Sequence, residues 1–395
     1  MPIITLPILL SQLAAASLFL DVGAPVAVEG TDAHPWIRTF PAETGWWILH
    51  SAGNDYLLNH LGDDLVIDDL PRTLTDRADL VDHAITRCPD GGFLHASFSQ
   101  TDGIDTQWVF RYDRDWNLLN AQAVVDGDGE VRASDPPVVC SEPLNATGYS
   151  RGVELPFRMV RLSTEGASLG TLDLDDGVMA QGSGMLVDED AGALVVVGNA
   201  GYGGITLRLR RYDLGDLHLL EARDLEVPFD SSRRPFWPQG VMRVGDYVLV
   251  AYVVTTLASG TAADSGDIWL SAYDDGWNLV ESTAVVEEPV EWEAYMRPGL
   301  SRKGEHLLVS FDHHNGDRLA MVILDLDALG VEGGDSGLFD TGTHPSDSDG
   351  PQDSGPPPGD DGSACGCGTT APLASSTLLA SLAAWASFAR RRRSR

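Results

Sequence analysis

Two short segments combine arginine with aromatic side chains, and one of them adds two carboxylates. An aromatic ring can stack on the face of a sugar, and an arginine can hold a carboxylate through two parallel hydrogen bonds. Each segment precedes a strand-like run, so each can belong to a loop that faces a ligand; packing between neighbouring units is the alternative. The candidate ligand-binding residues are Arg234, Trp237, Glu291, Trp292, Glu293 and Arg297.

The sequence leaves the catalytic residues unknown. A glycosidase needs two carboxylates held close together, one of them with a raised pKa, but the chain has 59 Asp and Glu residues and nothing singles out a pair. Residues 148–152 match the pattern G-x-S-x-G. A nucleophile elbow needs a helix after the serine, however, and strand-like segments flank this one. We therefore expect a non-enzymatic protein, with a glycan-active enzyme as the alternative.

No segment has the spacing of a dedicated metal or cofactor site. The run DHHNGD, residues 312–317, contains adjacent histidines, which point to opposite faces of an extended chain. Residues 126–130, DGDGE, are rich in oxygen ligands but lack the spacing of an EF-hand loop. We expect no metal and no cofactor; a structural calcium ion is the alternative that the acidic composition suggests.

One recurring segment indicates the fold. YDRDWNLLNAQAVV, from Tyr112 to Val125, returns as YDDGWNLVESTAVV from Tyr273 to Val286, and a weaker copy starts at Tyr212. Each copy follows an apolar, strand-like run that is itself preceded by a glycine-centred turn. Units of about 50 residues made of four short strands are typical of the blades of a β-propeller.

The units predict an all-β domain over residues 36–330, a single β-propeller of six blades, with five or seven blades as alternatives. Stacking the blades radially buries both apolar faces of each sheet. We expect Trp116 and Trp277 to pack between blades at the turn that leads into the outer strand. The aspartates expected to cap this turn are Asp113, Asp213 and Asp274.

Residues 264–269, DSGDIW, resemble part of the Asp-box of sialidase-like propellers, and residues 102–108 are a poorer match. The position two places before the aspartate, which is Ser or Thr in that family, is Ala262 here. The box is a structural turn in that family. The resemblance therefore implies the fold and assigns no catalytic residue.

The charge excludes two classes of partner. Lys and Arg number 26 against 59 Asp and Glu, which gives a formal net charge of −33 at pH 7. A chain of this charge repels the phosphates of nucleic acids and anionic lipid headgroups.

The N-terminus has the features of a secretory signal peptide. Residues 3–20 form an apolar run that ends in small residues, although no Lys or Arg precedes it. We assign residues 1–27 to this leader, with cleavage between Ala14 and Ala27; a retained membrane helix is the alternative. In an exported protein, the two cysteines of the domain are expected to form a disulfide, and two free thiols are the alternative; they are Cys88 and Cys140.

The C-terminal part contains two segments of different composition. Residues 331–364 are rich in Gly, Pro, Ser and Asp, which predicts a disordered, self-repelling acidic linker. Residues 365–395 contain Cys365 and Cys367, an apolar stretch over 371–389 and a terminal arginine cluster. The apolar stretch is long enough to span a bilayer or nearly so, and the arginines place the domain outside by the positive-inside rule.

This layout resembles the C-terminal sorting tags of the myxobacterial type, known as MYXO-CTERM. The resemblance covers residues 365–395 and the acidic linker before them. It implies that a sorting protease removes the tail and that Cys365 or Cys367 becomes the retained, lipid-modified end. An uncleaved membrane anchor is the alternative. Both place the propeller at the cell surface or outer membrane.

We therefore expect an exported, surface-anchored propeller that binds a carbohydrate, a peptide or a protein. Two alternatives are an extracellular glycan-active hydrolase or lyase of the propeller type and a structural envelope protein. The expected partners are a carbohydrate or protein ligand, the membrane through the C-terminal tail and a sorting protease, with no nucleic acid.

Overall fold

The computed structural model describes most of the first 331 residues. The chain divides into two compact units, residues 1–342 and 343–395, and the second unit lies wholly outside the described residues. The predictions for the linker beyond Val331 and for the sorting tag, with Cys365, Cys367 and the apolar stretch 371–389, lie outside them too. The described residues are 17–28, 37–52, 55–75, 80–101, 104–125, 136–150, 157–174, 182–199, 206–230, 232–256, 266–287, 296–312 and 318–331.

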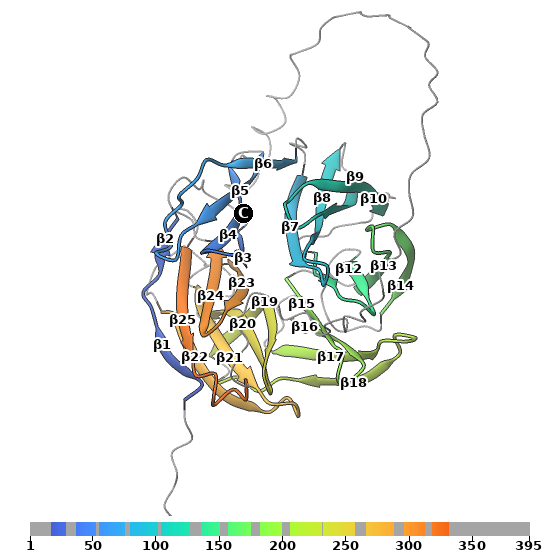
Figure 1. Cartoon of the computed structure of the whole chain (residues 1–395). Helices are drawn as coiled ribbons and strands as arrows, with labels where there is room; N and C mark the ends of the chain where they lie inside the picture. Colours follow the sequence, from blue (N-terminus) through green and yellow to red (C-terminus); the bar gives the residue numbers. More distant parts are fainter. Residues whose placement is uncertain are drawn as a thin grey trace, which may run out of the picture. The chain divides into compact units, whose positions relative to one another are not determined.

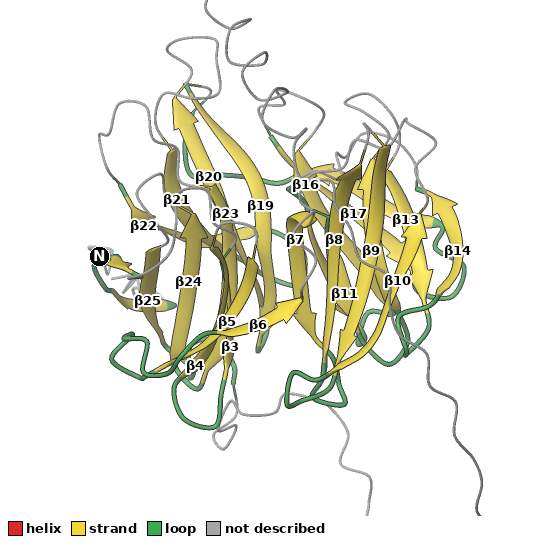
Figure 2. Ribbon diagram, turned by 90° about the horizontal axis from the view of Figure 1, so that it is seen from above, coloured by secondary structure: helices red, strands yellow, loops and turns green. Residues whose placement is uncertain are grey.

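The first unit is a ring of six antiparallel sheets, which confirms the predicted six-bladed β-propeller (Figure 1). Five blades have four strands and the sixth has five, and the first strand of a blade lies nearest the centre. Figure 2 shows the strands from the side. In the part of the chain that the structure describes, no helix is long and apolar enough to cross a membrane.

The strands follow the chain order around the ring. Blade 1 contains β3 (Arg38–Pro41), β4 (Trp46–Ala52), β5 (Asp55–Leu61) and β6 (Arg72–Thr75). Blade 2 contains β7 (Leu80–Arg87), β8 (Phe93–Thr101), β9 (Ile104–Tyr112) and β10 (Leu118–Val125). Blade 3 contains β11 (Val138–Cys140), β12 (Asn145–Ser150), β13 (Phe157–Leu162) and β14 (Ser168–Asp173). Blade 4 contains β15 (Gly184–Asp188), β16 (Ala193–Asn199), β17 (Leu207–Asp213) and β18 (Leu219–Asp224). Blade 5 contains β19 (Arg233–Val244), β20 (Tyr247–Thr256), β21 (Gly266–Tyr273) and β22 (Leu279–Val286).

The sixth blade combines strands from both ends of the unit. β23 (Met296–Lys303), β24 (His306–Asp312) and β25 (Arg318–Leu324) are followed in the sheet by β1 (Phe19–Val22) at the rim, and the short β2 (Val26–Ala27) also pairs with β25. The predicted leader, residues 1–27, overlaps β1 and β2. Its removal stays a prediction, and a cut that leaves the sixth blade complete has to lie before β1.

Among the described residues, buried apolar side chains form six clusters, and each cluster joins two neighbouring blades. Between blades 5 and 6, Leu270 of β21 lies in one cluster with Val309 of β24 and Val322 of β25. Both faces of every sheet are therefore buried against another blade. A single blade would expose both faces to water, so the ring is the stable unit.

The turn between the third and fourth strands holds a tryptophan in blades 2 and 5. Asp113 and Asp274 each accept a 2.8 Å hydrogen bond from the backbone N–H four residues further on. Trp116 and Trp277 follow in the left-handed conformation, with φ of 63° and 58°, and are 2% and 4% exposed. Each packs in the cluster that joins its blade to the preceding one. The predicted position of both tryptophans between blades is confirmed.

Candidate ligand-binding site

A cavity of about 640 Å³ lies at the centre of the ring. It is lined by the first strands of all six blades and by turns that follow them. These strands are far apart in the sequence, so only closure of the ring brings their side chains together. The lining strands are β3, β7, β11, β15, β19 and β23.

The charged side chains of the cavity are sorted by sign around the ring. Arginines come from blades 1, 2, 5 and 6, whereas carboxylates come from blades 3 and 4. Blades 6 and 1 lie opposite blades 3 and 4 in a ring of six, so a positive wall faces a negative one. The described charged residues of the lining are Arg38, Arg87, Arg243, Arg302, Glu142, Asp188, Glu189 and Asp190.

Arg243 lies where the arginines of the cavity wall meet the carboxylates. Its Nη2 lies 2.8 Å from Oδ2 of Asp188, the last residue of β15, and its Nη1 lies 2.8 Å from Oδ1 of Asp275. Burial lowers the pKa of Arg243, but the hydrogen bond to Asp275 and the charge of Asp188 outweigh it and raise the pKa. The guanidinium therefore stays charged and ties blade 4 to blade 5 at the cavity wall.

Arg38 is held across three blades. From β3 in blade 1, its Nη1 donates to the carbonyl oxygen of Arg297 (3.0 Å) in blade 6, and its Nη2 donates to Oε1 of Gln239 (2.6 Å) in blade 5. Gly299 leaves room for this side chain, because a Cβ there would lie 3.1 Å from Arg38 Cδ. The guanidinium of Arg38 is thus fixed in place at this wall.

A disulfide forms part of the cavity wall between blades 2 and 3. Cys88 and Cys140 are bonded, with their Cα atoms 4.9 Å apart, and both line the cavity. Arg87 lies beside this disulfide at the end of β7, and burial lowers the pKa of its guanidinium. The covalent link holds the ends of β7 and β11 together and so fixes the separation of Arg87 and Glu142.

Trp237, which the sequence suggested as a ligand-binding residue, has a packing role in the structure. It lies in β19 with φ of 45° and packs against the cluster between blades 5 and 6. A Cβ on Gly182 would come within 1.9 Å of its ring. Its backbone N–H donates to Oδ1 of Asn199 (3.0 Å). The tryptophan is therefore held by these contacts, stays partly exposed, and lies outside the lining of the central cavity.

Arg297 is also engaged within the protein. Its Nη1 lies 2.7 Å from Oδ2 of Asp312, whose side chain is buried, and its φ is 55°. Arg234 lies in β19 opposite Thr255 of β20. The structure thus places the described predicted residues near the starts of β19 and β23, on blades 5 and 6. The other three, Glu291, Trp292 and Glu293, lie outside the described residues. The structure therefore shows the positions of only Arg234, Trp237 and Arg297 among the predicted ligand-binding residues.

The patterns suggestive of catalysis lie in ordinary strands where they are described. Gly148 and Ser150 belong to β12, and a Cβ on Gly148 would collide with the ring of Phe157. Trp269 of the partial Asp-box lies in β21, the third strand of blade 5, while residues 264 and 265 lie outside the described residues. Of the run 312–317, only Asp312 is described.

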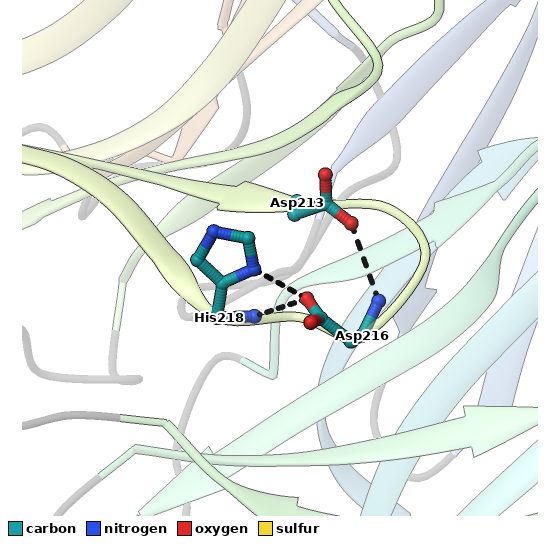
Figure 3. Close-up of side chains that lie close together, drawn as sticks. All are labelled: Asp213, Asp216 and His218. Carbon is teal, nitrogen blue, oxygen red and sulfur yellow. Dashed lines mark hydrogen bonds and ion pairs between the residues drawn. The ribbon is translucent and has the colours of Figure 1, made fainter.

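One group of side chains in the described part of the chain has the spacing of metal ligands. Asp213, Asp216 and His218 each offer a ligand atom within 4.8 Å of the others, in the turn between β17 and β18 (Figure 3). The same oxygens already accept hydrogen bonds: Asp213 Oδ1 from the backbone N–H of Gly215 (2.8 Å), and Asp216 Oδ1 from that of His218 (3.1 Å). These bonds are those of a polar turn, and they explain the cluster without an ion.

The cavity arginines and carboxylates were not found by sequence reasoning. Arg87 and Asp188 end their strands, and Arg243 and Arg302 are the last residues but one of theirs. Their common signal is a charged residue at the end of the first strand of a unit, shortly before the turn glycine. That signal becomes meaningful only when the units are aligned as blades around one axis.

The fold and the cavity define a six-bladed β-propeller with a central cavity lined by charged residues. No family model matches the chain, and no curated protein matches it either. Solved structures similar in fold include a DUF4623 family protein from Bacteroides eggerthii, with 12% identity, coverage of 76% of this chain and 77% of that one, and a TM-score of 0.41.

Two further structures are similar at the same level. A candidate glycoside hydrolase from Bacteroides ovatus has 11% identity, covers 64% of this chain and 88% of its own, and has a TM-score of 0.43. A subtype N11 neuraminidase-like protein from A/flat-faced bat/Peru (H18N11) has 13% identity, covers 77% and 94%, and has a TM-score of 0.44. These values describe the fold alone.

Proposed function

We propose that this protein is an exported, surface-attached binding module whose central cavity takes a peptide or protein segment carrying both positive and negative groups. The observation that carries the proposal is the arrangement of charge in the cavity, with arginines of blades 6 and 1 facing carboxylates of blades 3 and 4. A ligand with groups of both signs satisfies both walls at once, whereas a ligand of one sign is repelled by one of them.

The composition of the lining favours such a segment over a sugar. Carbohydrate sites commonly offer aromatic rings for stacking, and Phe40 is the one aromatic residue among the described residues of the lining. The volume of about 640 Å³ falls in the ordinary range for small-molecule sites, which is also large enough for a few side chains of a peptide. Polar and aliphatic walls with fixed arginines suit a charged peptide group.

A glycan-active hydrolase or lyase of the propeller type receives less support. A general acid for glycoside cleavage needs a carboxyl group with a raised pKa. Wherever a described Asp or Glu shows a shifted pKa, the shift is downward; the residues concerned are Asp90, Asp113, Glu165, Asp216, Asp230 and Asp274. Hydrogen bonding stabilises the ionised form of each of them.

The exported and surface-attached part of the proposal rests on the two ends of the sequence. The apolar run of residues 3–20 supports secretion, and the apolar stretch with its arginine cluster supports attachment through the C-terminal tail. The disulfide between Cys88 and Cys140 agrees with an oxidising compartment. We include the membrane, through the tail, and a sorting protease among the proposed partners, and no cofactor.

The test measures binding of four synthetic decapeptides to the purified chain: one of mixed Lys and Glu, one of Lys, one of Glu and one of Gly and Ser. We expect the mixed peptide to bind most tightly at physiological salt. Arg302→Gln and Glu142→Gln should each weaken it about tenfold, because each removes one charged partner. The matched control is Arg208→Gln, which breaks an ion pair with Asp224 on blade 4 outside the cavity lining.

Equal binding of the mixed peptide by the two cavity variants and by the unaltered protein would overturn the cavity as the site. Tighter binding of a soluble glycan than of any peptide, with slow cleavage of that glycan, would replace the binding module by the enzyme.

A further inference from the structure

The sixth blade reproduces a turn that four other blades form within one continuous stretch of chain. In blades 2, 3 and 5, the residue after the third strand donates its backbone N–H to the carbonyl of the residue before the fourth strand, and in blade 4 the last residue of the third strand does so. The pairs are Asp113 to Asn117 (3.0 Å), Ser163 to Ala167 (2.8 Å), Asp213 to His218 (3.0 Å) and Asp274 to Asn278 (3.1 Å).

In the sixth blade the same bond joins the two ends of the unit. The backbone N–H of Asp325, directly after β25, donates to the carbonyl of Leu18, directly before β1, across 3.0 Å. The register also agrees. Phe19 pairs with Leu324 and a bulge follows, as it does where Leu118 pairs with Tyr112 in blade 2. Leu18 therefore takes the place of Asn117, and Ser17 takes that of the turn residue before it.

The chain is tied to the ring from Ser17 onward. Glu281 of β22 holds both residues before β1: its Oε2 accepts the backbone N–H of Leu18 (2.6 Å), and its Oε1 lies 2.6 Å from Oγ of Ser17. Leu18 is 3% exposed and Phe19 is 7% exposed, and both lie in the core cluster between blades 5 and 6. A cut after Leu18 or Phe19 would remove part of the core, and a cut after Ser17 would remove its contact with Glu281.

We infer that the leader is cut at the bond between Ala16 and Ser17, so that the mature chain begins with Ser17. The inference rests on export, which is part of the proposed function. Of the window from Ala14 to Ala27, only bonds before Ser17 leave both the sixth blade and the contact of Ser17 with Glu281 complete. Residues 14–16 are three alanines, which meet the requirement of a leader peptidase for small residues one and three places before the cut.

Hydrolysis at this bond places a new charge beside Glu281. Water supplies the hydroxyl that converts the Ala16 carbonyl to a carboxyl group and the proton that completes the Ser17 amine. The free α-amino group, with an ordinary pKa of about 7.7–8.0, is largely protonated at neutral pH. It belongs to the residue whose hydroxyl contacts Glu281, so cleavage replaces a neutral amide with a cation next to this carboxylate.

The first experiment determines the N-terminal residue of the full chain after export, by intact mass and N-terminal sequencing. Ser17 as the first residue supports the inference. A start at Ala15, Ala16 or Leu18 overturns the position of the cut, and a start at Phe19 or later, which loses the buried Leu18, overturns the closure of the sixth blade as well. An uncut chain that begins at residue 1 overturns the cut, and its retention inside the cell overturns the export as well, so the two failures are distinguishable.

Three variants separate neighbouring bonds. Ala16→Asp and Ala14→Asp place a charge one and three residues before the proposed cut and should leave the leader attached. Ala15→Asp is the matched control, because the intervening position is free to vary, and it should be processed normally. Retention of the leader in Ala15→Asp would overturn the inference, since it would place the cut one residue earlier.

Discussion

His83 and His95 form a buried pair on neighbouring strands of blade 2, with Nδ1 of His83 2.9 Å from Nε2 of His95. The ring of Tyr56, from blade 1, stacks on His83 with a centroid separation of 3.7 Å. Burial lowers the pKa of His95 to about 3. Burial also lowers the pKa of His83, as do the charges of His95, Arg297 and Arg38. Both imidazoles are therefore neutral in the folded protein at neutral pH.

This pair predicts a loss of stability in mild acid. A histidine whose folded pKa lies below its unfolded value of about 6.5 binds more protons in the unfolded state than in the folded state. The free energy of unfolding therefore keeps its full value above about pH 6.5 and falls as the pH is lowered toward about 3. The slope is about 1.4 kcal/mol per pH unit for each such histidine. Urea unfolding between pH 7 and 4 measures it.

The matched pair of variants for this test is His95→Phe and His306→Gln. His95→Phe removes one buried titrating group and should flatten the slope, whereas His306 is exposed in the hairpin of blade 6 and its replacement should leave the slope unchanged. An identical slope in His95→Phe would show that the acid sensitivity arises elsewhere.

Replacement of Phe19 tests the contribution of β1 to the ring. Phe19→Ala should lower the free energy of unfolding by about 3 kcal/mol, because it removes a buried ring from the cluster between blades 5 and 6. The neighbouring Leu20 is 59% exposed, and Leu20→Ala should change stability by less than about 0.5 kcal/mol. Equal effects of the two substitutions in chemical denaturation would contradict the placement of β1.

The disulfide should contribute measurably to stability. Cys88 and Cys140 are separated by 52 residues, and the chain-entropy treatment gives about 4 kcal/mol for a closed loop of this length. We expect reduction with dithiothreitol to lower the midpoint of urea unfolding. The variant Cys88→Ser with Cys140→Ser should start from the lower midpoint and show no response to the reductant. A response in that variant would point to an effect of the reductant that is unrelated to this bond.

We expect the blade 5 turn, through Asp274, to make a pH-dependent contribution to the free energy of unfolding. The side-chain amide of Asn278 and then its backbone N–H stabilise the carboxylate and lower its pKa. The stabilisation is therefore present above the unfolded pKa of about 3.9 and is lost as the pH falls through the lower folded value. Asp274→Ala should lower the unfolding midpoint at pH 7 and differ less from the unaltered protein at pH 3. Glu305→Ala, at an exposed carboxylate in another turn, should show neither effect.

The blade architecture could be predicted from local pattern. Three patterns can be recognised within a single unit, without knowledge of the other units. They are the turn glycines, the repeated YDxxWNL segments and the alternation of apolar residues. Trp116 and Trp277 could be placed between blades because a buried turn residue in a repeat can only pack against a neighbouring repeat. The aspartates before them were identifiable as turn caps for the same local reason.

The closing strand and the cavity could not be predicted in this way. Phe19 to Val22 form a strand of four residues that begins at the end of an apolar run typical of a leader, and their partner, β25, lies at the other end of the unit. The walls of the cavity depend on which blades stand opposite each other. Arg302 and Asp188 become parts of one site only through the closed ring, and no local pattern contains that information.

The position of β1 also sets an order of events during synthesis. β1 is the first described strand to be made, yet β25, the strand with which it pairs, is the last. Its pairing is among the contacts most distant in sequence, the kind that slows folding. The earlier blades can form as they appear, but their open edges stay exposed until the final hairpin arrives. The ring therefore cannot close before β25 has been made, and a closed ring contains all six blades.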